Sequence, residues 1–248
     1  MTIYERLKRA IEEEERCVLF TVVEGEPLGA KLLVLESGET LGALDGPFVV
    51  QANELIRGAR PKLLELEGRK VFADVHGPPP RLFVYGAVDA ADSLCQAAKL
   101  LGWEAIVADA RAKFATRERM PNANEIIVAW PEEALAQVAP DHATAVVVLT
   151  HDDKFDVPAL QGALATEAFY IGALGSRRNQ ERRRERLLAA GVSAADFERI
   201  SGPCGLDIGA DTPAETALSI IAETLTVRAG REGGPLRSAR GRIHVEIG

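Results

Sequence analysis

The sequence predicts an α/β protein, because short apolar runs alternate with helical stretches throughout its second half. These runs are rich in Val, Ile, Leu and Ala, as in parallel strands that are buried on both faces. In the first third, by contrast, three strand-like runs follow one helix with only turn signals between them. We therefore expect a Rossmann-like doubly wound parallel sheet over residues 82–228, preceded by a smaller α+β domain over residues 1–76.

Composition narrows the class of protein. The 248 residues carry a formal net charge of −8, which argues against nucleic acid or an anionic membrane as the main partner. No run reaches the roughly 18–20 apolar residues that span a bilayer, and the first residues lack an apolar signal core, so we expect a cytoplasmic protein. The three cysteines, Cys17, Cys95 and Cys204, are too widely spaced for a zinc knuckle or a disulfide framework.

The smaller domain is expected to begin with a helix over residues 2–15, where Thr2 and Glu5 have the spacing of a capping box. Turn residues at 25–27 and 37–38 separate the strands that follow. The remaining expected elements are strands at 17–23, 30–35, 40–44 and 71–75 and a helix at about 50–66 that is broken by Pro61.

A proline run marks the predicted domain boundary, with a stiff linker at residues 77–81. Strands are then expected at 82–85, 105–108, 125–128, 145–149 and 168–171. Helices are expected at about 90–101, from 131, at 158–164, after 176 and from 212, and the chain ends in a tail over residues 229–248.

Ligands of doubly wound sheets bind at the carboxyl ends of the strands, so the residues that follow each strand are candidates. The first turn has Gly86 and Ala91 at two positions of a dinucleotide-binding motif, but Val88 replaces the glycine at which backbone approaches pyrophosphate. Asp89 adds negative charge there. Asp109 ends the second strand, where a carboxylate can bind a ribose hydroxyl or simply cap a turn.

Two further strand ends are rich in polar residues. Thr150, His151 and Asp152 follow one strand and form either a binding mouth or a turn with a solvated histidine. Another strand leads into a helix that is rich in arginine, through candidate anion-binding residues: Gly172, Gly175, Ser176, Arg177 and Arg178. The alternative there is a tight turn before a salt-bridged helix exposed to solvent.

The glycine-rich segment after this helix supplies two more candidates. Asp207, in the loop at 205–211, lies either on the rim of a ligand site or in a local turn. Cys204 is the one cysteine placed in a loop, and it is the only candidate for a metal ligand.

Several of these motifs together resemble the xanthine dehydrogenase accessory factor family (XdhC/CoxI). The resemblance rests on residues 170–178, on 150–152, and on 205–210 followed by 212–215, which occur in the family's order between about 82 and 228. Residues 29–34 are similar to the family's small domain. The chain resembles a divergent member, because the segment at 42–50 lacks the cysteine of the family's Gly-Gly-Cys-Val-Glu-like motif.

The resemblance implies a function in the maturation of a molybdenum enzyme. Members of the family bind molybdenum cofactor, a pterin that carries a phosphate, shield it while a cysteine desulfurase exchanges an oxo ligand for sulfur, and pass it to a xanthine-dehydrogenase-type hydroxylase. This role needs no catalytic residue of the accessory protein, and it implies a cofactor-binding chaperone, with a homodimer as the expected assembly.

Two other functions are compatible with the residues. The Rossmann pattern with Asp109 would suit an NAD(P)-dependent oxidoreductase, although Val88 and Asp89 predict weak binding of that cofactor. The chain could also act as a scaffold that bridges a sulfurase and its target enzyme without binding a small ligand.

Overall fold

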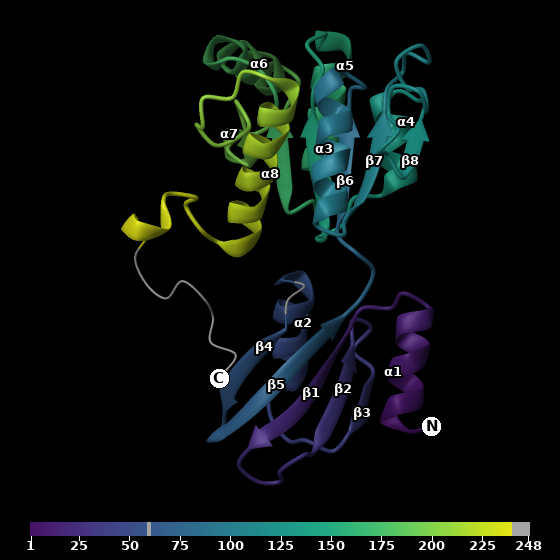
Figure 1. Cartoon of the computed structure of the whole chain (residues 1–248), viewed down its shortest axis with the longest axis vertical. Coiled ribbons are helices and arrows are strands. Elements are labelled where there is room, and N and C mark those ends of the chain that lie inside the picture. The colour runs from purple at the N-terminus through teal and green to yellow at the C-terminus, as the bar shows by residue number, and fades with distance from the viewer. Residues whose placement is uncertain (59–60, 240–248) are drawn as a thin grey trace. The chain divides into compact units, whose positions relative to one another are not determined.

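A computed structural model describes residues 1–58 and 61–239 of the chain. The chain divides into two compact units, one formed by Met1–Pro78 with Gly234–Gly248 and the other by Pro79–Gly233 (Figure 1). The division falls inside the proline run in which the sequence predicts a linker. Of the expected tail, residues 240–248 lie outside the described residues.

The first unit is an antiparallel sheet with two helices. Its sheet has the strand order β3-β2-β1-β5-β4. The capping box predicted at Thr2 is confirmed, since the Glu5 amide donates to the Thr2 hydroxyl at 3.2 Å and the Thr2 amide to the Glu5 carboxylate at 2.7 Å. The elements are α1 (Ile3–Glu12), β1 (Cys17–Glu24), β2 (Lys31–Leu35), β3 (Thr40–Gly42), α2 (Phe48–Gly58), β4 (Lys62–Leu66) and β5 (Arg69–His76).

The two helices of this unit cover opposite faces of the sheet, as the alternation of side chains along β1 requires. Val18 and Phe20 pack in one core with Phe48 of α2, whereas Cys17 packs in the other core with Ala10 of α1. Each face of the sheet thus carries a buried apolar cluster, and the unit has a core of its own.

The sequence-based prediction of a helix up to residue 66 is wrong. Residues 62–66 form β4, which pairs antiparallel with β5 across a two-residue loop. The loop residues, Glu67 and Gly68, have φ values of 51° and 76°, as in the tight turns that match the twist of a hairpin. Pairing with β5 thus overrides the helix propensity of Lys, Leu and Glu in this segment.

The second unit is the predicted doubly wound domain, with a six-stranded parallel sheet in the order β11-β10-β9-β6-β7-β8. Taken in chain order, this is the 3-2-1-4-5-6 arrangement of a Rossmann fold. Its elements are β6 (Arg81–Tyr85), α3 (Asp89–Leu100), β7 (Glu104–Ala108), β8 (Glu125–Ile127), α4 (Pro131–Val138), β9 (Thr144–Val148), α5 (Asp153–Leu164), β10 (Tyr170–Ala173), α6 (Arg177–Ala189), α7 (Ala194–Phe197), β11 (Ile200–Ser201) and α8 (Pro213–Ala229).

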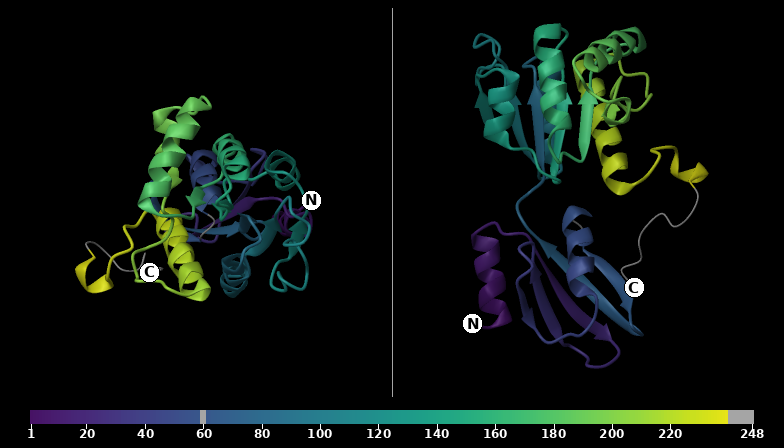
Figure 2. Two further views of the ribbon diagram at one scale, coloured as in Figure 1. Left: turned by 90° about the horizontal axis from the view of Figure 1, so that it is seen from above. Right: turned by 180° about the vertical axis from the view of Figure 1, so that it is seen from behind.

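Helices cover both faces of this parallel sheet. In Figures 1 and 2, α3 and α8 lie on one face, and α4, α5 and α6 lie on the other. Successive residues of β6 point to the two sides: Leu82 packs in one core with Leu94 of α3 and Ile220 of α8, and Phe83 packs in the other with Leu160 of α5. No helix that the structure describes is long and apolar enough to cross a membrane.

Two element boundaries differ from the sequence-based expectation and affect the candidate site. Helix α5 begins at Asp153 rather than near Pro158, because Asp152 caps it by accepting from the Lys154 amide at 3.2 Å. Strand β10 extends to Ala173, so Gly172 belongs to the strand and not to the turn. A Cβ atom at Gly172 would lie 2.6 Å from the Tyr170 ring, so this glycine makes room for a buried side chain.

Candidate functional site

The candidate site lies where the strand order reverses, between β6 and β9, as expected for a doubly wound sheet. A pocket of about 480 Å³ opens there, within the volume range of small-molecule sites. We call it the switch-point pocket. It is lined by Val88, Arg111, Leu149, Thr150, His151, Asp152 and Asp153.

The turn after β6 shapes one wall of the switch-point pocket. Gly86 has a φ of 113°, and a Cβ atom there would lie 3.2 Å from backbone atoms of Leu149 and Thr150. The glycine thus lets the ends of β6 and β9 approach closely. Val88 then precedes α3 and presents an apolar side chain to the pocket, with no side-chain cap on the helix.

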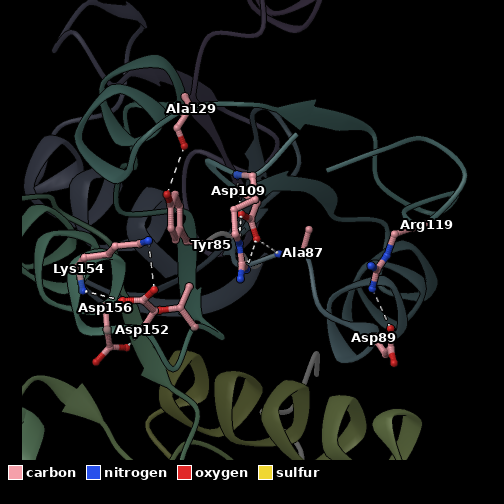
Figure 3. Close-up of polar contacts among 11 residues, drawn as sticks. Tyr85, Ala87, Asp89, Asp109, Arg119, Ala129, Asp152, Lys154 and Asp156 are labelled. Atoms are coloured by element: carbon pink, nitrogen blue, oxygen red, sulfur yellow. Dashed lines mark hydrogen bonds and ion pairs between the residues drawn. The ribbon is translucent and has the colours of Figure 1, made fainter. Parts of the chain in front are cut away.

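Asp109, which follows β7, is buried with 1% of its surface exposed and is bonded to the first turn. Its carboxylate accepts from the Ala87 amide at 2.9 Å, the Arg111 amide at 2.9 Å, and Nε and Nη2 of Arg111, each at 2.8 Å (Figure 3). A carboxylate has about four acceptor positions, and these four bonds use them. A ribose hydroxyl would have to displace one of these donors.

Burial raises the pKa of Asp109, but the hydrogen bonds from Arg111 and Ala87 outweigh it and hold the pKa below its usual value. The guanidinium of Arg111 also lies near two aromatic rings, 4.4 Å from the centroid of Phe114 and 5.7 Å from that of Phe155. Carboxylate and rings together fix this cation at the wall of the switch-point pocket. Arg111 is not among the site residues predicted from the sequence. Its position two residues after Asp109, within reach of an ion pair, could have indicated it.

The residues after β9 form another side of the switch-point pocket. Thr150 is buried, whereas His151 and Asp152 are exposed. Asp152 caps α5 and lies 3.3 Å from the Lys154 ammonium (Figure 3). Asp152 thus caps the turn, as one alternative for this segment expects, and it also lines the pocket.

A second, smaller pocket adjoins the first and lies between α5 and α6. It has a volume of about 160 Å³ and is called here the α5–α6 pocket. It is lined by His151, Asp153, Asp156, Asn179, Arg182, Arg183 and Arg186. His151 and Asp153 line both pockets, so the two are neighbours that share these side chains.

A buried ion pair joins the two helices of the α5–α6 pocket. Arg183 donates from Nε to Asp156 at 2.7 Å and from Nη2 to the same carboxylate at 3.1 Å. Their side chains are 4% and 8% exposed. The Thr150 hydroxyl, at 3.5 Å from Asp156, connects this pair to the end of β9. The ion pair thus links α6 to the wall of the switch-point pocket.

The start of α6 has the predicted glycine turn and two first-turn arginines, but these arginines line neither pocket. Ser176 caps the helix by accepting from the Asn179 amide at 3.2 Å, and Gly175 has a φ of 151°. Arg177 and Arg178 lie in the first turn with exposed side chains, and neither lines either pocket. The arginines that do so are Arg182, Arg183 and Arg186, one and two turns farther along.

The last two sequence candidates lie apart from both pockets. Asp207 is exposed in the loop before α8. Cys204 is buried beside the end of β10, where its amide donates to the Ala173 carbonyl at 3.0 Å. Within residues 1–58 and 61–239, no group of three or more His, Cys, Asp or Glu side chains is arranged to hold a metal ion.

The thiols provide a first prediction. Burial raises the pKa of Cys17 to about 11 and the pKa values of Cys95 and Cys204 to about 12, so the reactive thiolate is scarce near neutral pH. We expect a disulfide reagent at pH 8 to label none of the three thiols within minutes in native protein and all three in urea. Rapid labelling of Cys204 in the native protein, with Cys204→Ser as the control, would contradict this.

Comparison with known proteins agrees with the fold. The model of the XdhC Rossmann domain matches residues 82–224. A crystal structure named as a xanthine dehydrogenase from Bacillus halodurans superposes with a TM-score of 0.70 at 26% identity, over 94% of this chain and 69% of that one. The similarity therefore extends over both units of the chain.

Three curated relatives are also similar. The uncharacterized protein YqeB of Escherichia coli is 28% identical over 83% of this chain and 41% of its own length. A Bacillus subtilis protein, named as a probable xanthine dehydrogenase component, is 34% identical over 61% of this chain and 44% of its own length. The molybdenum cofactor insertion chaperone PaoD of Escherichia coli is 38% identical over 42% of this chain and 32% of its own length.

The chain spans less than half the length of each of these three relatives. The family model, however, matches more than half of the chain and coincides with the parallel-sheet unit that holds both pockets. With the Rossmann strand order and the similarity to the solved structure, this match identifies the protein: the chain belongs to the XdhC family.

Proposed function

We propose that this XdhC-family protein binds molybdenum cofactor as a cargo and serves in the maturation of a xanthine-dehydrogenase-type molybdenum hydroxylase. Two relatives support the proposal, since one is named as a molybdenum cofactor insertion chaperone and another as a probable component of xanthine dehydrogenase. A cysteine desulfurase that sulfurates the cofactor, and the hydroxylase that receives it, are the proposed protein partners. A homodimer is the proposed assembly.

The observation that carries the proposal is the composition of the switch-point pocket. Val88 and Leu149 provide apolar contact for a planar heterocycle, and the carboxylates of Asp152 and Asp153 line the same space. A pterin has a flat ring system with adjacent N–H donors on one edge, which a carboxylate can accept as a pair. The residues present therefore fit a pterin, with Arg111 as a cation in the same lining.

Binding, orientation and exclusion of water are the tasks of the chain in this role, and none of them requires turnover. The apolar wall shields one part of the ligand, and the fixed Arg111 and Asp152 orient it. No residue is assigned a catalytic step. The protein acts as a carrier, and its own side chains do not alter the ligand chemically.

An NAD(P)-dependent oxidoreductase is supported by the Rossmann strand order but not by the residues of the first turn. Val88 stands where a glycine would admit the pyrophosphate, and the oxygens of Asp109 are already bonded to Ala87 and Arg111. Calorimetric titration with NAD(H) and NADP(H) distinguishes the two functions. Micromolar binding of either nucleotide would favour the oxidoreductase.

The proposal is tested by the cofactor content of protein purified from a host that makes molybdenum cofactor. Pterin and molybdenum should co-purify with the wild-type protein or be taken up saturably in vitro. For Asp152→Asn, we expect at least about tenfold weaker binding, because a charge-assisted hydrogen bond is worth about 1.5 kcal/mol or more. Asn caps a helix as well as Asp does, so the fold should be retained.

Asp207→Asn is the matched control for this variant. It makes the same chemical change at an exposed aspartate that lines neither pocket, and it should leave pterin binding unchanged. Equal losses in the two variants would reject the assignment of Asp152. The absence of both pterin and molybdenum from the wild-type protein, with no uptake in vitro, would reject the proposed function.

A further inference from the structure

The α5–α6 pocket has an excess of positive charge that the switch-point pocket lacks. Three guanidinium groups and two carboxylates line it. Asp156 is neutralised by Arg183, and Asp153 is ion-paired with Arg186. Both acids that line this pocket are therefore already matched by a cation.

Arg182 is the cation that remains. Among residues 1–58 and 61–239 it has no ion-pair or hydrogen-bond partner, and its side chain is exposed to solvent. The side-chain amide of Asn179 and the imidazole of His151 line the same pocket and can each supply an N–H donor. A guanidinium with two neutral donors beside it suits a tetrahedral oxyanion, which accepts several hydrogen bonds at once.

The position of this pocket suggests how an oxyanion there would be connected. Because His151 and Asp153 line both pockets, the two spaces are close enough for one ligand to place different groups in each. The α5–α6 pocket has one third of the volume of its neighbour. A planar ring in the larger space and a compact charged group in the smaller one match both sizes.

We propose that the α5–α6 pocket is the phosphate subsite of the ligand that occupies the switch-point pocket, with Arg182 as its main contact and Asn179 and His151 as further donors. The inference rests on the proposed function for the identity of the ring, but the anion site itself rests only on the pocket. It also places the phosphate one turn beyond Arg178, which has the same chemistry at an exposed position that lines no pocket.

The test compares two ligands and two variants. The ligands are the fluorescent oxidised pterin prepared from molybdenum cofactor, which retains its phosphate, and the same pterin after phosphatase treatment. The wild-type protein should bind the phosphorylated form more tightly. Arg182→Gln should weaken binding of that form about 10- to 100-fold and leave binding of the dephosphorylated form unchanged, whereas Arg178→Gln should change neither.

Three results would overturn the inference: equal affinity of the wild-type protein for the two pterins, loss of the phosphate effect in Arg178→Gln instead of Arg182→Gln, or equal weakening of both pterins by Arg182→Gln. If the wild-type protein binds neither pterin, the proposed function fails. The anion site is then tested separately by titration with inorganic phosphate. Phosphate should then shift the NMR signals of the Asn179 side chain in the wild-type protein but not in Arg182→Gln. The absence of a shift in both proteins would overturn the subsite.

Discussion

Asp156→Ala is expected to lower the free energy of unfolding of the unit Pro79–Gly233 by about 3–5 kcal/mol. The substitution leaves the guanidinium of Arg183, whose side chain is 4% exposed, without its carboxylate partner. Its remaining bonds, to the Leu174 carbonyl at 3.0 Å and the Gln180 side chain at 2.7 Å, involve neutral acceptors. An unpaired buried charge is much more costly than the loss of the ion pair itself.

Tryptophan fluorescence during urea unfolding measures this effect selectively. The chain has two tryptophans, Trp103 and Trp130, and both lie in the Pro79–Gly233 unit. The control is Asp153→Ala, which removes an exposed partner of Arg186 and should cost no more than about 1 kcal/mol. Equal destabilisation by the two substitutions would show that the buried pair has no special role.

A double variant separates the charge effect from packing. Asp156→Leu combined with Arg183→Met replaces the pair by apolar side chains of similar volume, and it should recover most of the stability that Asp156→Ala loses. We expect it to remain deficient in ligand binding, because the Thr150 hydroxyl loses its partner at the pocket wall.

Asp109→Ala is expected to destabilise the same unit by about 2–4 kcal/mol, because it removes four hydrogen bonds, two of them to a guanidinium. The Ala87 amide is left buried without an acceptor, and Arg111 loses the carboxylate that fixes it at the pocket wall. The variant should therefore also bind pterin poorly. Urea unfolding and pterin titration measure the two losses separately.

The stability that Asp109 provides depends on pH with a defined sign. Its pKa in the folded protein is below the usual value near 3.9. The unfolded chain therefore takes up the proton first, so the stabilisation is complete above about pH 5 and is lost as the pH falls further. Asp109→Asn cannot ionise and should show a smaller loss of stability between pH 5 and pH 2. Identical pH profiles for this variant and the wild-type protein would contradict the assignment.

The features predicted best from the sequence are those with local causes. Thr2 and Glu5 cap their helix as the spacing predicts, and Thr212 and Glu215, at the same spacing, cap α8, because a capping box involves only neighbouring residues. The parallel sheet was predictable because its buried strands contain almost only apolar residues. The strand at 62–66 is only weakly indicated by the sequence. The two residues after it, Glu67 and Gly68, both have positive φ values, as a two-residue hairpin turn requires, but Glu is an unusual residue in such a turn.

The candidate site was predictable only in part, because its polar contacts join residues that are distant in sequence. The turn at 150–152 could be placed at a strand end from its local pattern. The pairing of Arg183 with Asp156, 27 residues away, could not, because each arginine of α6 has the same local chemistry. One indirect signal exists: Arg183 precedes the fully buried Leu187 by four residues, which places both on the same face of the helix.

The reversal of strand order between β6 and β9 also determines when, during folding, the switch-point pocket is completed. These strands pair in parallel from Arg81 and Thr144 onward, which are about 60 positions apart, and pairings of such long range form slowly because a long loop must close first. The two walls of the switch-point pocket come together only at this step. A chain in which this pairing has not formed therefore has no complete switch-point pocket.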